Sequence, residues 1–247
     1  MTANEMADEL ELRLDRSYTY GSPGYEDFEL SSALTQAQSH YVKSFYSEKN
    51  NRKGYGFEES EVRNQGLAEL LSSSVNPLSS DQTGVLTNGF YYDLPLDFMY
   101  TVYEEVEIDA KDCDNNNIIA DVKVISHDEI RKLKGNKYKK PSVNLTEPRI
   151  WRTQYSRNIN TSSPTVAATN KRHQLITDGI YNIVNYKMNY LINPPEINVD
   201  RNTINNQKSC ILDESTHEII IDIARDILLG IVKEQKLQTE IDQKDLE

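Results

Sequence analysis

Histidine and cysteine are the side chains best suited to metal binding or nucleophilic chemistry, and here their spacing favours neither. No histidine lies within four residues of another histidine or of a cysteine; the histidines are His40, His127, His173 and His217. Local metal motifs need such short spacings. Cys113 and Cys210 form no paired motif, which is typical of idle thiols in a reducing compartment. We interpret His217 as an ordinary residue of a helix's first turn.

One acidic stretch resembles a calcium loop but fails at two essential positions. Asp112 to Asn117 alternates oxygen ligands, yet Asn117 stands where glycine is needed and Lys123 where a bidentate glutamate is needed. We interpret it as a turn between strands. The chain has no glycine-rich phosphate loop, nucleophile elbow or zinc-protease motif. Its 39 acidic residues leave a general acid–base pair open, but we expect no catalytic residues, no metal and no cofactor.

The bulk composition describes an acidic, polar chain. Its net charge of −12 disfavours a nucleic-acid binder, because phosphate binding depends on lysine and arginine. Tyrosine is abundant, with 15 copies, and suits either protein interfaces or half-buried strands. The acidic first ten residues lack the apolar stretch of a signal peptide. No run approaches the roughly 18 apolar residues of a membrane span, so we expect no membrane partner.

The basic residues gather in one segment, from Arg131 to Lys140. It holds five lysines and one arginine and no acidic residue. The functional interpretation is docking to an acidic partner surface or to the DNA backbone. The alternative is a solvated loop.

Apolar residues recur at helical spacing along three segments before residue 74. The predicted helices span 3–19, 25–48 and 57–73. A Gly/Pro-containing break separates the first two, and Asn76–Pro77 follows the third.

From about residue 86 the apolar spacing changes to two, which is typical of strands. The predicted strands span 90–94, 100–108, 118–125, 149–155, 173–177 and 181–192. Asp178–Gly179 between the last two strands is a hairpin signal. One or two helical turns are expected at 127–133.

A long aliphatic helix is predicted over 214–240, with Ser215 and Glu218 as a capping box at its start. Its wide apolar arc indicates burial among other helices. We therefore predict an α+β fold, in which a helical layer of three N-terminal helices plus the long C-terminal helix carries an inserted, mainly antiparallel β-domain. The predicted domains are 1–85 and 199–247, which together make the helical domain, and the β-domain 86–198.

Six segments, taken in order, resemble a known family. They are Ser22–Gln38 with its Leu-Thr-Gln-Ala-Gln run, Phe57–Arg63, Tyr92–Glu104, Val124–Glu129, Tyr186–Ile197 with its double proline, and Cys210–His217 with Ala224-Arg225. Together they are similar to neck ring proteins, or head-to-tail adaptors, of crAss-like tailed bacteriophages. Asn193, where the family more often has a basic residue, and the loop 156–171 depart from the family pattern.

The resemblance implies a structural virion protein and not an enzyme. Such proteins form closed rings, usually of twelve copies, in the phage neck, where they join portal to tail and form part of the DNA channel. The implied partners are other copies of the chain, the portal protein, other neck ring or tail proteins, and double-stranded DNA that passes through the lumen without specific binding. The implied location is the virion, assembled in the bacterial cytoplasm.

The residues selected as subunit or ring contacts come from three places: the double-proline join, the basic segment and the end of the last helix. They are Tyr186, Tyr190, Pro194, Pro195, Lys137, Lys139, Lys140, Leu237 and Ile241. Two other functions stay open: a tail-associated hydrolase that uses paired carboxylates, and a cytosolic protein-binding module.

Overall fold

The computed structural model describes residues 1–17, 25–46, 65–80, 82, 85–111, 114, 116–142, 148–156, 171–201 and 206–244. The chain divides into two compact units. The helical unit contains residues 1–70 and 193–247, and the β unit contains residues 71–192. Whether these units match independent domains with the predicted limits at 86 and 198 stays a prediction.

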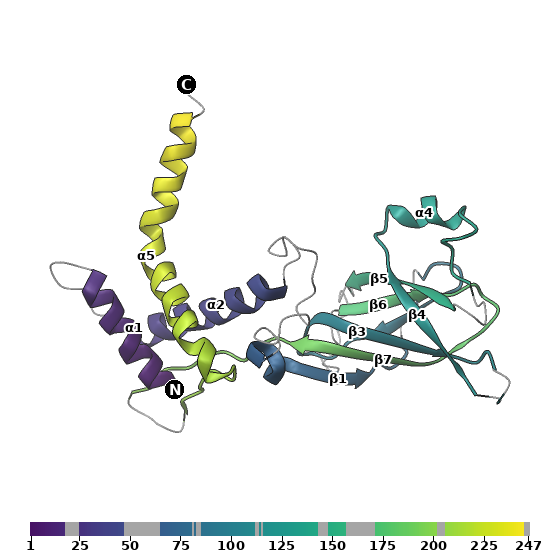
Figure 1. Ribbon diagram of the computed structural model, residues 1–247, viewed down its shortest axis with the longest axis horizontal. Helices are drawn as coiled ribbons and strands as arrows, with labels where there is room; N and C mark the ends of the chain where they lie inside the picture. The colour runs from purple at the N-terminus through teal and green to yellow at the C-terminus, as the bar shows by residue number, and fades with distance from the viewer. Residues whose placement is uncertain are drawn as a thin grey trace. The chain divides into compact units, whose positions relative to one another are not determined.

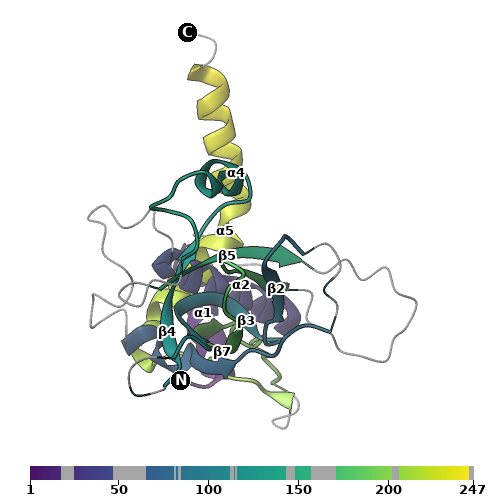
Figure 2. The same ribbon diagram turned by 90° about the vertical axis from the view of Figure 1, so that its right-hand side faces the viewer.

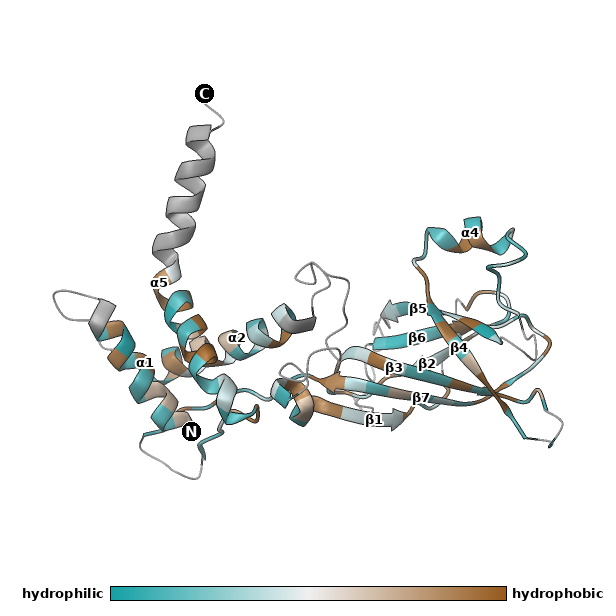
Figure 3. Cartoon of the chain, in the orientation of Figure 1, coloured by the Kyte–Doolittle hydropathy of each residue, from teal (hydrophilic) through white to brown (hydrophobic). Residues whose placement is uncertain are grey.

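The helical unit contains α1 (Ala3–Ser17), α2 (Asp27–Tyr46), the 3₁₀ turn η3 (Ala68–Leu70) and α5 (Glu214–Lys244). Apolar residues at helical spacing pack where α1, α2 and α5 meet (Figures 1 and 3). The fully buried members include Met6, Leu10, Leu14, Leu34, Ala37, Ile220 and Ala224. The predicted first, second and last helices therefore form the core of this unit.

Side-chain hydroxyls on α2 hold the segment that returns from the β unit. Thr35 Oγ1 accepts a hydrogen bond from the Ile197 amide at 3.0 Å, and Ser31 Oγ accepts one from the Val199 amide at 2.9 Å. Arg201 then forms ion pairs with Asp8 and Glu11 of α1. The segment 197–201 is therefore tied to two helices by side chains.

The start of α5 differs from the predicted capping box. Asp213 Oδ1 accepts a hydrogen bond from the Ser215 amide at 2.9 Å. Hydrogen bonding from the Ser215 hydroxyl, and then from this amide, lowers the pKa of Asp213. The helix begins at Glu214, so Ser215 lies inside the first turn and cannot cap it. His217 is buried there, with Nε2 2.9 Å from the Leu212 carbonyl oxygen, which confirms its predicted position in the first turn.

The β unit is one curved sheet of seven strands (Figures 1 and 2). The strands are β1 (Leu71–Val75), β2 (Gly89–Asp93), β3 (Phe98–Ile108), β4 (Ile118–Val124), β5 (Arg149–Ser156), β6 (Lys171–Ile176) and β7 (Ile183–Ile192). Their order is β1-β7-β3-β4-β5-β6-β2. All neighbouring pairs are antiparallel except β4 and β5. The predicted α+β class with a mainly antiparallel sheet is confirmed.

Figure 2 shows the strands curving around a shared interior. Alternate residues of each strand point inward, as the period of two requires. The inward set forms two adjoining clusters, which include Tyr92, Val106, Ile108, Ile150, Leu175, Tyr186, Phe98, Met188 and Tyr190. The abundant tyrosines thus serve in part as core residues, with the rings of Tyr92 and Tyr186 5.5 Å apart.

Two local predictions were wrong. Residues 71–73 of the predicted third helix belong to strand β1, which pairs with β7 from Leu71↔Leu191 to Val75↔Lys187; residues 57–64 of that helix lie outside the described residues. Asp178–Gly179 does reverse the chain, with Gly179 at φ +82°. However, β6 pairs with β5 and β2, whereas β7 pairs with β3 and β1, so the turn joins no hairpin. The Asp-Gly pair indicates only that the chain turns at this point. Which strands pair is determined by the other neighbours of β6 and β7 in the sheet.

Candidate interaction surface on the crossover between β4 and β5

The parallel pairing of β4 with β5 creates the most exposed feature of the β unit. Parallel neighbours cannot be joined by a tight turn, so the chain must cross over between them. The connection, residues 125–148, carries the short helix α4 (Glu129–Lys134) and is called the crossover below. Figure 1 shows α4 on this connection, on the side of the sheet where β5 lies.

Apolar packing fixes α4 on the sheet. Ile130 and Leu133 of α4 pack against the cluster of Ile125, Trp151 and Ile176. Just before the helix, His127 Nε2 lies 2.9 Å from the Gln154 carbonyl oxygen of β5. A helix of six residues is too short to be stable alone, so these contacts determine its position.

Hydrogen bonds to the backbone order the turn that follows α4. Trp151 Nε1 donates to the Lys139 carbonyl oxygen, and Arg149 Nη1 donates to the Tyr138 carbonyl oxygen, both at 2.9 Å. The amides of Lys139 and Lys140 donate to the Asn136 carbonyl oxygen at 3.1 and 3.0 Å. Trp151 and Arg149 lie on the same face of β5. Their side chains therefore hold the backbone of the turn in one position relative to this strand.

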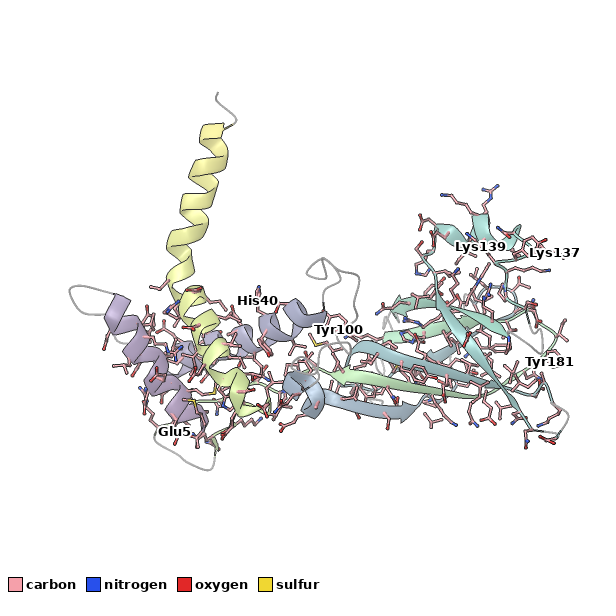
Figure 4. All side chains as sticks on the ribbon, viewed as in Figure 1. Glu5, His40, Tyr100, Lys137, Lys139 and Tyr181 are labelled. Carbon is pink, nitrogen blue, oxygen red and sulfur yellow. The ribbon has the colours of Figure 1, made fainter. Side chains whose placement is uncertain are left out.

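The side chains of the crossover are mostly cationic and exposed. The basic residues are Arg131, Lys132, Lys134, Lys137, Lys139 and Lys140, and all are exposed. Within the part of the chain that the structure describes, none of these six forms an ion pair. Tyr138, among the last three lysines, is 85% exposed. Lys137–Lys140, partly visible in Figure 4 through Lys137 and Lys139, is called the lysine tip.

The other selected contact residues lie in different environments. Tyr186 and Tyr190 are buried in the β unit, and Pro194 is buried in the helical unit, so we do not retain them as contact residues. Pro195 is exposed. Leu237 and Ile241 belong to α5, but their side chains lie outside the described residues. Among the seven of these residues whose side chains the structure describes, the three lysines share one exposed turn.

A buried polar cycle lies inside the sheet, and the sequence alone did not reveal it. Arg152 Nε pairs with Glu104 Oε1 at 2.8 Å, and Arg152 Nη1 lies 2.8 Å from His173 Nε2. His173 Nδ1 lies 2.6 Å from the Tyr186 hydroxyl, which donates to Glu104 Oε2 at 2.6 Å. One assignment of protons satisfies every contact: His173 is neutral, with the proton on Nδ1, and accepts from Arg152 at Nε2.

The electrostatics of this cycle follow from burial. Desolvation, with the nearby Arg152 charge, lowers the pKa of His173 to about 2, which keeps the imidazole neutral. Desolvation raises the pKa of Glu104, against the opposing effects of Arg152 and the Tyr186 hydroxyl. A signal existed in the sequence, since Glu104 and Tyr186 occupy inward positions of predicted strands. Period-two spacing could not show that four strands bring these groups together.

The geometry of the cycle is that of a structural element that joins strands, and not of a catalytic site. Its members join β3, β5, β6 and β7, and each is at most 9% exposed. Both carboxylate oxygens of Glu104 are engaged, so this acid is not free to act on a substrate. Among the described residues, no group of three histidine, cysteine or carboxylate side chains could hold a metal ion.

No helix within the described ranges is both long and apolar enough to cross a lipid bilayer.

The sequence distributes its charge unevenly between the two units. The helical unit holds 25 acidic and 13 basic residues, whereas the β unit holds 14 of each. The helical unit therefore carries the whole net charge of −12, and the crossover is a basic feature of an otherwise acidic β unit.

Comparison with known proteins gives a consistent family across nearly the whole chain. A family model described as phage tail ring protein 3/4 matches residues 1–241. The chain is 24% identical to ring protein 4/5 of Bacteroides phage crAss001 over 236 residues, which cover 91% of this chain and 90% of that protein. It is 23% identical to ring protein 3 of the same phage over 246 residues, covering 96% and 98%.

Proposed function

The chain belongs to the phage tail ring protein 3/4 family, and we propose that it forms a closed homo-oligomeric ring of twelve copies in the neck of a phage particle. In that position the ring joins the portal to the tail. The observation that carries the proposal is the family match over residues 1–241, together with two relatives that are themselves ring proteins. The family is structural, so the function is mechanical.

Ring closure sets a physical requirement that this molecule can meet. In a cyclic ring of more than two copies, one face of each subunit contacts a different face of its neighbour. The chain offers two different units, one acidic and one neutral overall with a basic crossover. Such asymmetry suits repeated head-to-tail contacts.

The acidic charge suits a channel for DNA. Twelve copies would carry roughly −144 formal charges, from −12 per copy. Acidic groups that face the lumen would repel the phosphate backbone, so the genome could slide through without binding. The proposed partners are accordingly other copies of the chain, the portal protein, and other neck ring or tail proteins, with DNA passing and not held.

Quantitative mass spectrometry of purified phage particles tests the proposal. The molar amount of this chain is measured against the portal protein. A ratio near one, or a small whole multiple, supports a ring, and symmetry analysis of electron micrographs of the neck then counts its copies. Absence of the chain from particles would overturn the proposal and favour the cytosolic binding module.

A further inference from the structure

The lysine tip is a fixed cationic surface without a partner among the described residues. Its backbone is held by Trp151 and Arg149, while Lys137, Lys139 and Lys140 are exposed without ion pairs. A turn ordered by its neighbours loses less entropy when a partner binds it. Its chemistry, three ammonium groups around one exposed tyrosine ring, suits an acidic partner with an exposed aromatic ring.

The helical unit has a surface of that kind. An open groove of about 450 Å³ runs between α2 and the 196–198 segment; its lining includes Phe28, Thr35, Gln36, Glu196, Asn198 and Lys208. Phe28 is 79% exposed, the highest exposure of any apolar side chain on the described helices. This surface is called the α2 groove.

Carboxylates outnumber cations around the α2 groove. Glu196 lines it, and the exposed Glu26 and Glu29 lie on either side of Phe28 in the chain. Glu29 Oε2 accepts a hydrogen bond from the Glu26 amide at 3.0 Å, so these two residues are close in space. Lys208 is the one cation in the lining. The lining itself therefore holds one carboxylate and one ammonium group, and Glu26 and Glu29 add two exposed carboxylates next to Phe28 in the chain.

We propose that the lysine tip of one copy docks into the α2 groove of a neighbouring copy. Tyr138 packs against Phe28, and the three lysines pair with Glu26, Glu29 and Glu196. The contact joins two different faces, which is the arrangement a closed ring needs. The inference rests on the proposed ring and identifies one of its subunit contacts.

A second groove of the described surface fits the lysine tip less well. It lies on the outer face of β1, β7 and β3, and its lining includes Val75, Tyr103, Glu105 and Lys187. Each groove has one carboxylate and one ammonium group in its lining. The α2 groove differs because Glu26 and Glu29 lie beside its Phe28 and because it belongs to the acidic helical unit, whereas the β unit has no net charge. Charge complementarity therefore favours the α2 groove.

Charge reversal on each side provides the test, in phage whose own copy of the chain is inactivated and supplied from a plasmid. The tip variant is Lys137→Glu, Lys139→Glu and Lys140→Glu. The groove variant is Glu26→Lys, Glu29→Lys and Glu196→Lys. A chain with both sets of changes is the third variant. Infectious particles are counted, and the ratio of chain to portal protein is measured.

Each single variant should reduce particles by about tenfold or more, because like charges then meet at every contact. Co-expression of the two single variants should restore them, since alternating copies bring opposite charges together around an even-numbered ring. The third variant should restore them as well. The control reverses Lys111, Lys123 and Lys187, which are also exposed in the β unit, and should assemble normally.

Three results would overturn the inference. Normal assembly of both single variants would show that the contact does not exist. Recovery with the third variant but not with co-expression would place the contact within one chain. A defect in the tip variant that neither combination repairs would assign the lysines to DNA or to another phage protein. Absence of even the wild-type chain from particles would instead overturn the proposed ring.

Discussion

At the scale of single residues, the polar cycle of Glu104, Arg152, His173 and Tyr186 is the most consequential feature of the β unit. It buries a charged pair, which is costly unless every partner is hydrogen-bonded. Each member contacts two others at 2.6 to 2.8 Å. Three of these contacts are hydrogen bonds, and the fourth, from Arg152 Nε to Glu104 Oε1, is an ion pair in which Nε makes no hydrogen bond. Removal of one member should therefore lower the free energy of unfolding by more than the loss of an ordinary surface hydrogen bond does.

Tyr186→Phe removes the hydroxyl that joins Glu104 to His173. The change should lower the free energy of unfolding by about 1–3 kcal/mol, because a buried carboxylate oxygen and an imidazole nitrogen lose their partner. Urea denaturation measures the difference. Tyr103→Phe, whose hydroxyl bonds Glu105 on the exposed surface, is the matched control and should change stability by less than about 0.5 kcal/mol. Equal effects in the two variants would contradict a special role for the cycle.

The neutral state of His173 makes stability depend on pH. Between the ordinary pKa of 6.5 and the folded value of about 2, the unfolded chain binds a proton that the folded chain does not. Stability should therefore fall as pH falls below 6.5, by up to about 1.4 kcal/mol per pH unit for this group. The raised pKa of Glu104 acts in the opposite sense, since the folded form binds its proton first on acidification.

His173→Gln should flatten this dependence. Unfolding free energies of the variant and the wild type, measured from about pH 7 to about pH 5, isolate the histidine contribution. His40→Gln, at an exposed position of α2, is the control and should keep the wild-type slope. A slope unchanged by His173→Gln would mean that the imidazole is already protonated in the folded chain.

At the scale of elements, two features depend on contacts made across the fold. The crossover exists because β4 and β5 are parallel, and α4 lies on the sheet because Ile130 and Leu133 reach the Trp151 cluster. The start of α5 depends on Asp213, which lies one residue before the helix. In both cases side chains outside the element define where it lies or begins.

Trp151→Phe keeps an aromatic ring in the cluster but removes the donor to the Lys139 carbonyl oxygen. The lysine tip should open more often, since a buried hydrogen bond contributes about 0.5–1.5 kcal/mol. Trypsin cleavage of the folded protein after the tip lysines should then accelerate several-fold, in line with that energy. Cleavage after Lys123 in β4 serves as the internal reference. An unchanged rate at the tip would show that other contacts order it.

Asp213→Ala should shorten or fray the start of α5, because the Ser215 amide loses its acceptor. The melting temperature should fall measurably and by more than in Ser215→Ala, which removes the hydroxyl that bonds Asp213 but keeps the amide bond. Amide exchange at Ser215 and Thr216 gives a local check on the same end of the helix. The reverse order of effects would restore Ser215 as the cap.

At the scale of the whole molecule, the β unit is an insertion with adjacent ends. Leu71 opens β1 and Leu191 lies next to the end of β7, and these residues are paired in the sheet. An inserted unit whose ends lie side by side does not need its host to close its own core. The two units also differ in charge, since the helical unit carries the whole net charge of −12 and the β unit has no net charge.

Residues 71–192, expressed alone, should therefore fold. Far-ultraviolet circular dichroism should show a β-rich spectrum with a cooperative thermal transition, and Tyr186→Phe should lower that transition as it does in the full chain. The shorter segment 86–198, which follows the limits predicted from sequence, lacks β1 and should be less stable, since β7 loses one of its neighbours. Equal stability of the two segments would show that β1 is dispensable.

The sequence by itself determined what depends on local spacing. Period-four apolar residues such as Met6, Leu10 and Leu14 identified α1, and similar patterns identified α2 and α5. Alternation from about residue 86 located most strands and thereby the α+β class. The basic segment was also visible, because exposed lysines without apolar partners need no tertiary information to be recognised.

Only the tertiary structure decided what depends on pairing between distant segments. Residues 71–73 became strand because β7 offers them an edge, and Asp178–Gly179 joined no hairpin because β5 and β2 flank β6. Tyr186 was selected as a contact residue but lies in a buried cycle with groups from three other strands. A period of two tells which residues share a face, but burial of that face and the choice of neighbouring strands are set by the long-range packing of the whole sheet.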